Sequence, residues 1–97
     1  MRVFARKTLH EFWTNHSDSK DALKAWFFEA ENSQWESSAD IKNNYPHAST
    51  LPDNRVVFNI KGNHYRLIIK INYDYRQVFI RFVGTHAEYD KINATTI

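Results

Sequence analysis

The spacing of apolar residues divides the chain into two parts. Before the proline at position 46, apolar side chains recur at helical intervals, whereas from Arg55 onward they alternate with polar ones. The first spacing places apolar side chains along one face of a helix, and the second places them on one face of a strand. The sequence therefore predicts helices in its first half and a sheet in its second.

The residues Arg2–Ala5 are consistent with a short first strand, and two helices are expected after it. Apolar residues at helical spacing predict the first helix over Lys7–His16. The segment Ser17–Ser19 interrupts this pattern and offers an N-cap for the second helix. The apolar stripe of the second helix consists of Ala22, Leu23, Trp26, Phe27 and Ala30. We expect the two helices to form a hairpin whose aromatic side chains pack in the core.

A short helix and a connector are expected between this hairpin and the sheet. Ser38–Asp40 offers a helix start, and the helix should end at Tyr45 because a following proline disfavours helical geometry. The stretch 43–54 is the one long loop-like segment, and it holds both prolines. With 97 residues the chain is long enough for one core, so we expect a single domain over residues 1–97.

The dipeptide Gly62-Asn63 is typical of a two-residue β-hairpin turn, in which a glycine supplies a positive φ angle. Such a turn would pair Lys61 with His64. Alternation then gives the hairpin two different faces. The apolar face collects Phe58, Ile60, Tyr65, Leu67, Ile69 and Ile71. The other face collects Asn59, Lys61, His64, Arg66, Ile68 and Lys70.

A further strand is expected after the polar break 73–76. Pairing Asn72 with Gln77 across this break continues the apolar face without a register slip, which supports the pairing. In this register Phe82 lies opposite Leu67 and faces the helices. The other face receives Phe79, Arg81 and Val83.

One face of the predicted sheet is rich in cations. Its four basic residues, with no acidic residue among them, are Lys61, Arg66, Lys70 and Arg81. An ordinary soluble surface mixes charges of both signs, so this pattern favours contact with a polyanion such as RNA. A merely solvated face is the alternative, because basic residues are common on exposed strands.

Composition narrows the possible functions. The formal net charge is +2 and the sequence pI is about 9.0, so the location of the charges matters more than their sum. The chain has no cysteine, which removes disulfides, a thiol nucleophile and cysteine-based zinc sites. It has no apolar run near the ~18 residues of a membrane span and no apolar signal segment. We expect a cytoplasmic protein without membrane contact and, since nucleotide-binding motifs are missing, without a cofactor.

Candidate catalytic residues follow the last predicted strand. His86, Tyr89 and Asp90 would share one side of a short helix that Thr85 could cap. With nearby arginines, they suit metal-independent RNA cleavage, in which the RNA 2′-OH attacks and the protein supplies proton transfer and positive charge. A structural cluster is the alternative. A metal site is disfavoured, because only two ligands are visible and the arginines would repel a cation.

Three segments carry a family resemblance. They are the first-helix run Arg6–Trp13, the segment Asn54–Leu67 with Gly62-Asn63-x-x-Arg66, and the segment Ile80–Lys91 with Thr85-His86-x-x-Tyr89-Asp90. Together they resemble the HigB toxins of type II toxin–antitoxin systems. The resemblance implies the RelE-like fold, an α+β arrangement with a small, twisted, mainly antiparallel sheet and two N-terminal helices packed on one face.

The resemblance also implies an activity and partners. HigB toxins are endoribonucleases that cut mRNA, generally during translation on the ribosome. A HigA-type helix-turn-helix antitoxin neutralises them, and the complex represses its own operon, so contact with operator DNA would run through the antitoxin.

Residue roles follow from position in the matching motifs. We expect Arg66 and Arg81 to hold the phosphate and the transition state, His86 to act as acid or base, and Tyr89 to stack on a base or assist proton transfer. Further RNA contacts are expected from Lys61, Asn63 and Lys91. Asn63 and Asp90 could also have structural roles. Asn63 would serve as a turn residue, and Asp90 would orient a neighbouring side chain.

Two other functions are compatible with the sequence. A non-catalytic module could hold RNA or the ribosome on the same basic face, and its binding would weaken with salt. A degenerate partner protein could serve only complex formation, although the retained Arg66, Arg81, His86 and Tyr89 argue against it.

Overall fold

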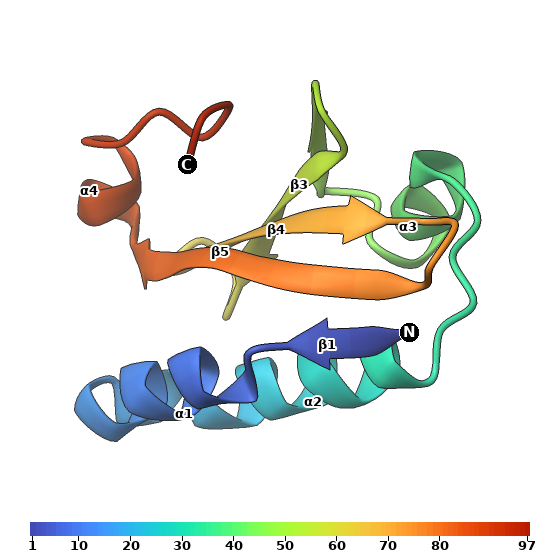
Figure 1. Ribbon diagram of the computed structural model, residues 1–97. Helices are drawn as coiled ribbons and strands as arrows, with labels where there is room; N and C mark the ends of the chain where they lie inside the picture. Colours follow the sequence, from blue (N-terminus) through green and yellow to red (C-terminus); the bar gives the residue numbers. More distant parts are fainter.

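A computed structural model describes residues 1–97 as an α+β domain built on one five-stranded mixed sheet (Figure 1). The strand order is β1-β5-β4-β3-β2, with β1 parallel to β5 and all other neighbours antiparallel. In chain order the elements are β1 (Arg2–Phe4), α1 (Arg6–Asn15), the 3-10 turn η1 (Ser17–Ser19), α2 (Lys20–Glu31), α3 (Ser38–Asn44), β2 (Ser49–Leu51), β3 (Arg55–Ile60), β4 (Tyr65–Asn72), β5 (Gln77–Thr85) and α4 (His86–Tyr89).

Most predicted elements are present, with two local differences in the first half. The connector 43–54 contains the edge strand β2, whose three residues are too few to produce a recognisable alternation. The Ser17–Ser19 segment forms a 3-10 turn rather than a side-chain cap, because Ser19 Oγ donates to the carbonyl oxygen of His16 at 2.7 Å. This bond turns the hydroxyl away from the free amides of α2.

The core lies between the sheet and the two long helices. Leu9 and Trp13 of α1 and Trp26 of α2 are buried in the same cluster as the alternating apolar residues of β3 and β4. Trp26 meets Phe58 edge to face, with ring centroids 5.4 Å apart. The apolar face predicted for β3 and β4 is therefore the inner face. The opposite face is called the open face below.

The register of the central hairpin is the predicted one, but its turn is longer. Ile60 pairs with Tyr65, so four residues rather than two connect β3 to β4. Positive φ angles fall at Lys61 and Gly62, at 51° and 62°, and Gly62 is the residue that adopts this geometry without a Cβ penalty. As a consequence, Lys61 and His64 are not a ladder pair.

A β-bulge changes the predicted register between β4 and β5. Ile69 pairs with Ile80 as expected, but Ile68 pairs with Phe82, so Arg81 is an extra residue without a partner. A bulge shifts the alternation of all later residues by one. Phe82 therefore lies on the open face and Val83 packs against the core, which reverses the prediction for both.

The C-terminal segment 90–97 lies over the open face, on the side of the sheet away from α1 and α2 (Figure 1). The carbonyl oxygen of Ile97 accepts hydrogen bonds from Arg55 Nε at 3.0 Å and from Arg81 Nε at 3.4 Å. Val57 and Ile68 are buried although they stand apart from the core cluster. The open face is thus partly covered.

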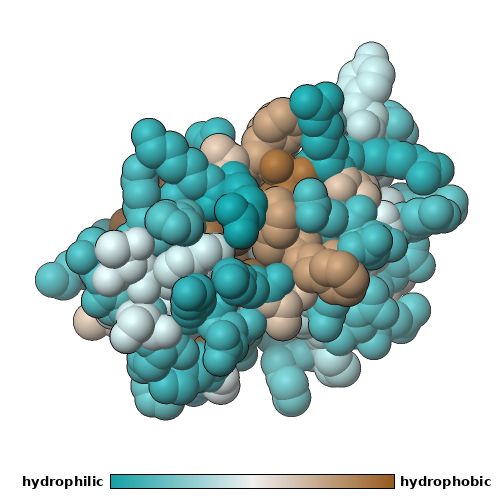
Figure 2. All heavy atoms as spheres, turned by 90° about the horizontal axis from the view of Figure 1, so that it is seen from below, coloured by the Kyte–Doolittle hydropathy of each residue, from teal (hydrophilic) through white to brown (hydrophobic).

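The outer side of the long helices carries apolar surface. Seen from that side, hydrophobic atoms gather in the middle of a largely hydrophilic surface (Figure 2). Phe28 of α2 is 67% exposed, whereas its neighbour Phe27 is partly buried against the core. No helix has the length and apolar character needed to cross a lipid bilayer.

Candidate functional site

Four polar residues that the sequence singled out as site candidates meet at one end of the sheet, where β4 begins and β5 ends. We call this group, Arg66, His86, Tyr89 and Asp90, the α4 cluster. Tyr65 pairs with Thr85, and the backbone amide of His86 donates to the carbonyl oxygen of His64 at 3.3 Å. These backbone contacts hold the short helix α4 beside the β3–β4 turn.

A capping box sets the direction of α4. Thr85 Oγ1 accepts a hydrogen bond from the Glu88 amide at 3.1 Å, and Glu88 Oε1 accepts one from the Thr85 amide at 2.9 Å. The bond from the Thr85 amide, and after it the Thr85 side chain, hold the pKa of the Glu88 carboxyl below its usual value. The predicted cap at Thr85 is therefore confirmed, and it fixes α4 although the helix has only four residues.

His86 and Asp90 form a pair across one turn of the chain. His86 Nδ1 lies 3.1 Å from Asp90 Oδ2, and both side chains are exposed. A carboxylate at this distance favours the tautomer that carries the proton on Nδ1, which leaves Nε2 as a proton acceptor. The arrangement can orient an imidazole for proton transfer to or from a bound molecule.

Arg66 connects the α4 cluster to the β3–β4 turn. Its guanidinium donates to the backbone oxygen and the Oδ1 of Asn63, at 3.1 and 3.0 Å, and to the carbonyl oxygen of Tyr65 at 3.2 Å. The ring of Tyr89 lies 5.8 Å from Arg66 Cζ. Arg66 is only 8% exposed, so its charge is held in place by the turn and by the aromatic ring.

Arg81 lies apart from the α4 cluster. Arg66 pairs with Gly84, which is three residues after Arg81 on β5, a separation of about 10 Å at ~3.3 Å per residue. The neighbours of Arg81 are Lys70 and Phe79, with which it borders a groove. The two predicted clamp arginines therefore occupy different parts of the open face.

Two of the predicted cations have acidic partners, so the expectation of a face without acidic residues is wrong. Lys61 Nζ lies 2.9 Å from Asp18 Oδ2, and Lys70 Nζ lies 3.1 Å from Asp53 Oδ2. Hydrogen bonds from Tyr65 and then Lys61 lower the pKa of the Asp18 carboxyl. Because Asp18 belongs to η1 and Tyr65 to the inner face, Lys61 is turned toward the helices rather than toward the open face.

The two other predicted RNA contacts lie near the α4 cluster. Asn63 is exposed in the turn, with its Oδ1 bonded to Arg66. Lys91 is exposed just after α4, and its charge contributes to the lowered pKa of Glu88. Both are therefore accessible from the same end of the sheet.

Besides His64 in the β3–β4 turn, a further imidazole that the sequence did not indicate lies at this end. His16, which follows α1, stacks on Phe12 with centroids 4.2 Å apart and lies 5.6 Å from the ring of Tyr65. Its ring thus packs on the same tyrosine whose backbone pairs with Thr85, the residue before α4. Only the tertiary fold brings His16 here, 70 residues before His86. No three histidine, aspartate or glutamate side chains come close enough together to hold a metal ion.

The fold and this site define a small α+β protein with a polar, arginine-supported cluster at one end of its sheet, the class to which RelE-like toxins belong. A family model described as HigB_toxin, the RelE-like toxic component of a toxin–antitoxin system, matches residues 19–92. The chain belongs to the HigB toxin family. No curated protein matches it significantly. The matched range contains the whole α4 cluster and begins after α1, so the resemblance of Arg6–Trp13 lies outside it.

Proposed function

We propose that this toxin is an endoribonuclease that cuts mRNA during translation on the ribosome, without a metal ion. Membership of a toxin–antitoxin family supports a toxin held by an antitoxin. The observation that carries the proposal is the pairing of His86 with Asp90 beside the Tyr89 ring that covers Arg66. It combines a proton-transfer group with a fixed positive charge at one end of the sheet.

The proposed reaction uses the RNA as its own nucleophile. The 2′-oxygen attacks the adjacent phosphorus while a base removes its proton, the bond to the 5′-oxygen breaks, and an acid protonates that oxygen. Nε2 of His86 is suited to one of these proton transfers and the Tyr89 hydroxyl to the other. The products are a 2′,3′-cyclic phosphate and a free 5′-hydroxyl.

The positive charges divide between the reacting phosphate and its neighbours. Arg66 is the cation of the α4 cluster and therefore the candidate for stabilising the transition state. Arg81 lies three residues along β5 from the partner of Arg66, about 10 Å away, and suits a neighbouring phosphate better than the reacting one. Asn63 and Lys91 suit contacts near the α4 cluster. Lys61 would reach RNA only by sharing or leaving Asp18.

The partner that we propose is a HigA-type helix-turn-helix antitoxin. In this proposal, operator DNA is contacted through the antitoxin and not by the toxin chain. Because the substrate is mRNA on ribosomes, the proposed place of action is the cytoplasm.

Induced expression without antitoxin tests the proposal. We expect growth arrest with cleaved mRNA, and a roughly 10²- to 10⁴-fold slower cleavage on programmed ribosomes for His86→Ala. His10→Ala is the matched control, because His10 is exposed on α1, which packs on the inner face of the sheet. Equal cleavage by the wild type and His86→Ala would remove His86 from the site.

A non-catalytic RNA- or ribosome-binding toxin is the second candidate. It is favoured by one observation: the guanidinium of Arg66 already donates three hydrogen bonds within the protein. Such a protein would arrest translation while leaving mRNA intact, so the length of the mRNA after induction separates the two functions.

A further inference from the structure

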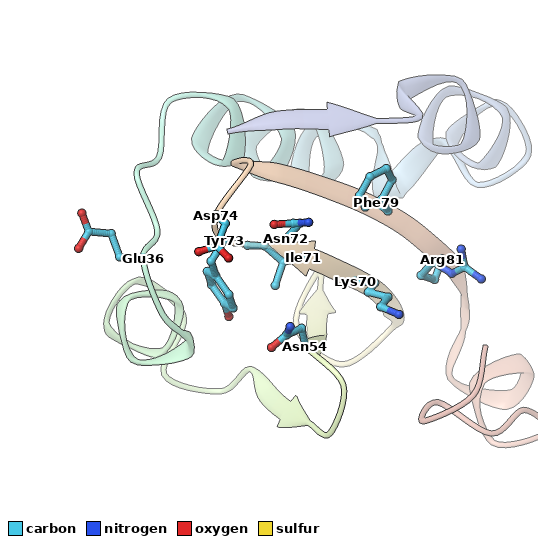
Figure 3. A pocket seen from close by; sticks show the side chains of 9 residues that line it. All are labelled: Glu36, Asn54, Lys70, Ile71, Asn72, Tyr73, Asp74, Phe79 and Arg81. Atoms are coloured by element: carbon cyan, nitrogen blue, oxygen red, sulfur yellow. The ribbon is translucent and has the colours of Figure 1, made fainter.

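A groove runs along the open face away from the α4 cluster. It has a volume of about 720 Å³ and is bordered by Lys70 and Asn72 of β4, Phe79 and Arg81 of β5, and Asn54 from the loop before β3 (Figure 3). This volume is in the range of sites for small ligands. Tyr73 also lines the groove, so it offers two aromatic rings, two cations and two side-chain amides, which are groups that contact a nucleotide.

The ring of Phe79 is held in place by a second aromatic ring on the neighbouring strand β1. Phe79 stacks on Phe4 of β1, with centroids 5.3 Å apart and an angle of 15° between the rings. The guanidinium of Arg2 lies 5.2 Å from the Phe4 centroid. Because β1 and β4 flank β5 on opposite sides, Phe4 covers the side of the Phe79 ring toward β1, and the other side faces Lys70, the ladder partner of Phe79 on β4. Phe79 is thus a rigid platform on the groove wall.

Positive charge is concentrated at one end of the groove. Arg81 uses Nε for the bond to Ile97, and its two terminal nitrogens have no hydrogen-bond partner. Lys70 shares its ammonium with Asp53. The carboxylates of Glu36 and Asp74 belong to the other end, away from Arg81 (Figure 3). A phosphate is therefore favoured at the Arg81 end and disfavoured at the opposite one.

We propose that this groove binds one nucleotide of a single-stranded RNA, with its base stacked on Phe79 and its phosphate held by Arg81 and Lys70. Aromatic platforms beside cations bind single strands in this way, because every base has a face that can stack. The inference rests on the proposed function and extends it: the α4 cluster would cut the strand, and the groove would hold the same strand a few nucleotides away.

Binding of a short single-stranded RNA tests the groove. In a His86→Ala background, which prevents cleavage, we expect Phe79→Ala to weaken binding about 5- to 150-fold, the range for loss of one stacked base. Phe79→Trp should retain the affinity. Phe28→Ala is the matched control, because Phe28 is an exposed phenylalanine on α2, on the other side of the sheet. An RNA carrying 2-aminopurine should lose fluorescence on binding, and Phe79→Ala should abolish this change.

Loss of folding is separated from loss of stacking by Phe79→Leu. Leucine keeps an apolar side chain beside Phe4 but offers no ring, so this variant should keep its thermal midpoint and still bind RNA weakly. RNA affinities of Phe79→Ala and Phe79→Leu equal to that of the wild type would overturn the proposal. Weakened binding of antitoxin with unchanged binding of RNA would also overturn it and assign the groove to a protein.

Different results would contradict the proposed RNA-binding groove and the proposed cleavage activity. If wild-type protein cuts mRNA and the Phe79 variants bind and cut it equally well, the groove is wrong and the nuclease stands. If wild-type protein leaves mRNA intact but RNA binding depends on Phe79, the nuclease is wrong and the groove stands.

Discussion

The Tyr89 ring lies over the Arg66 guanidinium, 5.8 Å from ring centroid to Cζ, and so joins α4 to β4. Arg66 also bonds to Asn63, so one side chain links the turn, the strand and the last helix. A cation over an aromatic ring contributes on the order of 0.5–1 kcal/mol at an exposed site and more when water is excluded. This contact makes the position of Tyr89 dependent on Arg66.

Tyr89→Phe separates the hydroxyl from the ring. The variant keeps the contact with Arg66, so we expect the thermal midpoint and the RNA affinity of the wild type. If the hydroxyl transfers a proton, single-turnover cleavage should fall roughly 10²-fold or more. Full activity in Tyr89→Phe, with a loss only in Tyr89→Ala, would limit the role of Tyr89 to packing on Arg66.

Arg66→Ala should reduce stability as well as activity. The side chain is 8% exposed and donates three hydrogen bonds, and the Asn63 and Tyr65 oxygens would lose their partner. We expect the free energy of unfolding to fall by about 1–3 kcal/mol in urea denaturation. Arg81→Ala is the control, because Arg81 is exposed and should change stability by less than about 0.5 kcal/mol. Equal stability of both variants would contradict the structural role of Arg66.

Gly84 tests the packing of the open face near Arg66. A Cβ at this position would overlap the ring of Phe82, which lies on the same face after the bulge. We expect Gly84→Ala to lower the free energy of unfolding by about 1–3 kcal/mol, as overpacking does. The double variant Gly84→Ala/Phe82→Leu should recover part of the loss. Additive losses in the double variant would show that the ring of Phe82 is not the obstacle.

Asp18 should make stability depend on pH in the acid range. Hydrogen bonds from Tyr65 and Lys61 lower its pKa in the folded state. Its ionised form therefore stabilises the fold above its unfolded pKa of about 4, and this contribution is lost as the pH falls through the lower folded value. Thermal midpoints between neutral and acid pH should fall less steeply for Asp18→Asn than for the wild type. Asp74→Asn, which removes an exposed carboxylate without an ion pair, should follow the wild-type curve.

The pattern of apolar residues predicted much of the sheet. It predicted the pairing of Ile60 with Tyr65 and of Ile69 with Ile80, because a slip would have moved apolar side chains off the core. It failed beyond Arg81. Phe82 and Val83 are both apolar, so the sequence is compatible with either of them facing the core, and alternation carries no signal of an extra residue.

The site was predictable where its contacts are local in sequence. The cap at Thr85 and the pair His86–Asp90 follow from spacings of three and four residues. The partners of Lys61 and Lys70 come from Asp18 and Asp53, 43 and 17 residues away. Contacts of this kind depend on how η1 and the loop before β3 pack against the sheet. The alternation of residues within one β-strand carries no information about that packing.

Because Arg81 has no ladder partner, the pairing of β4 with β5 does not depend on whether this residue is present. Residues on both sides of Arg81 have regular partners, Ile80 with Ile69 and Phe82 with Ile68. An in-frame deletion of Arg81 would therefore leave a continuous ladder in which α4 keeps its place. Gain or loss of this one residue would thus add or remove a cation on the open face without rebuilding the fold.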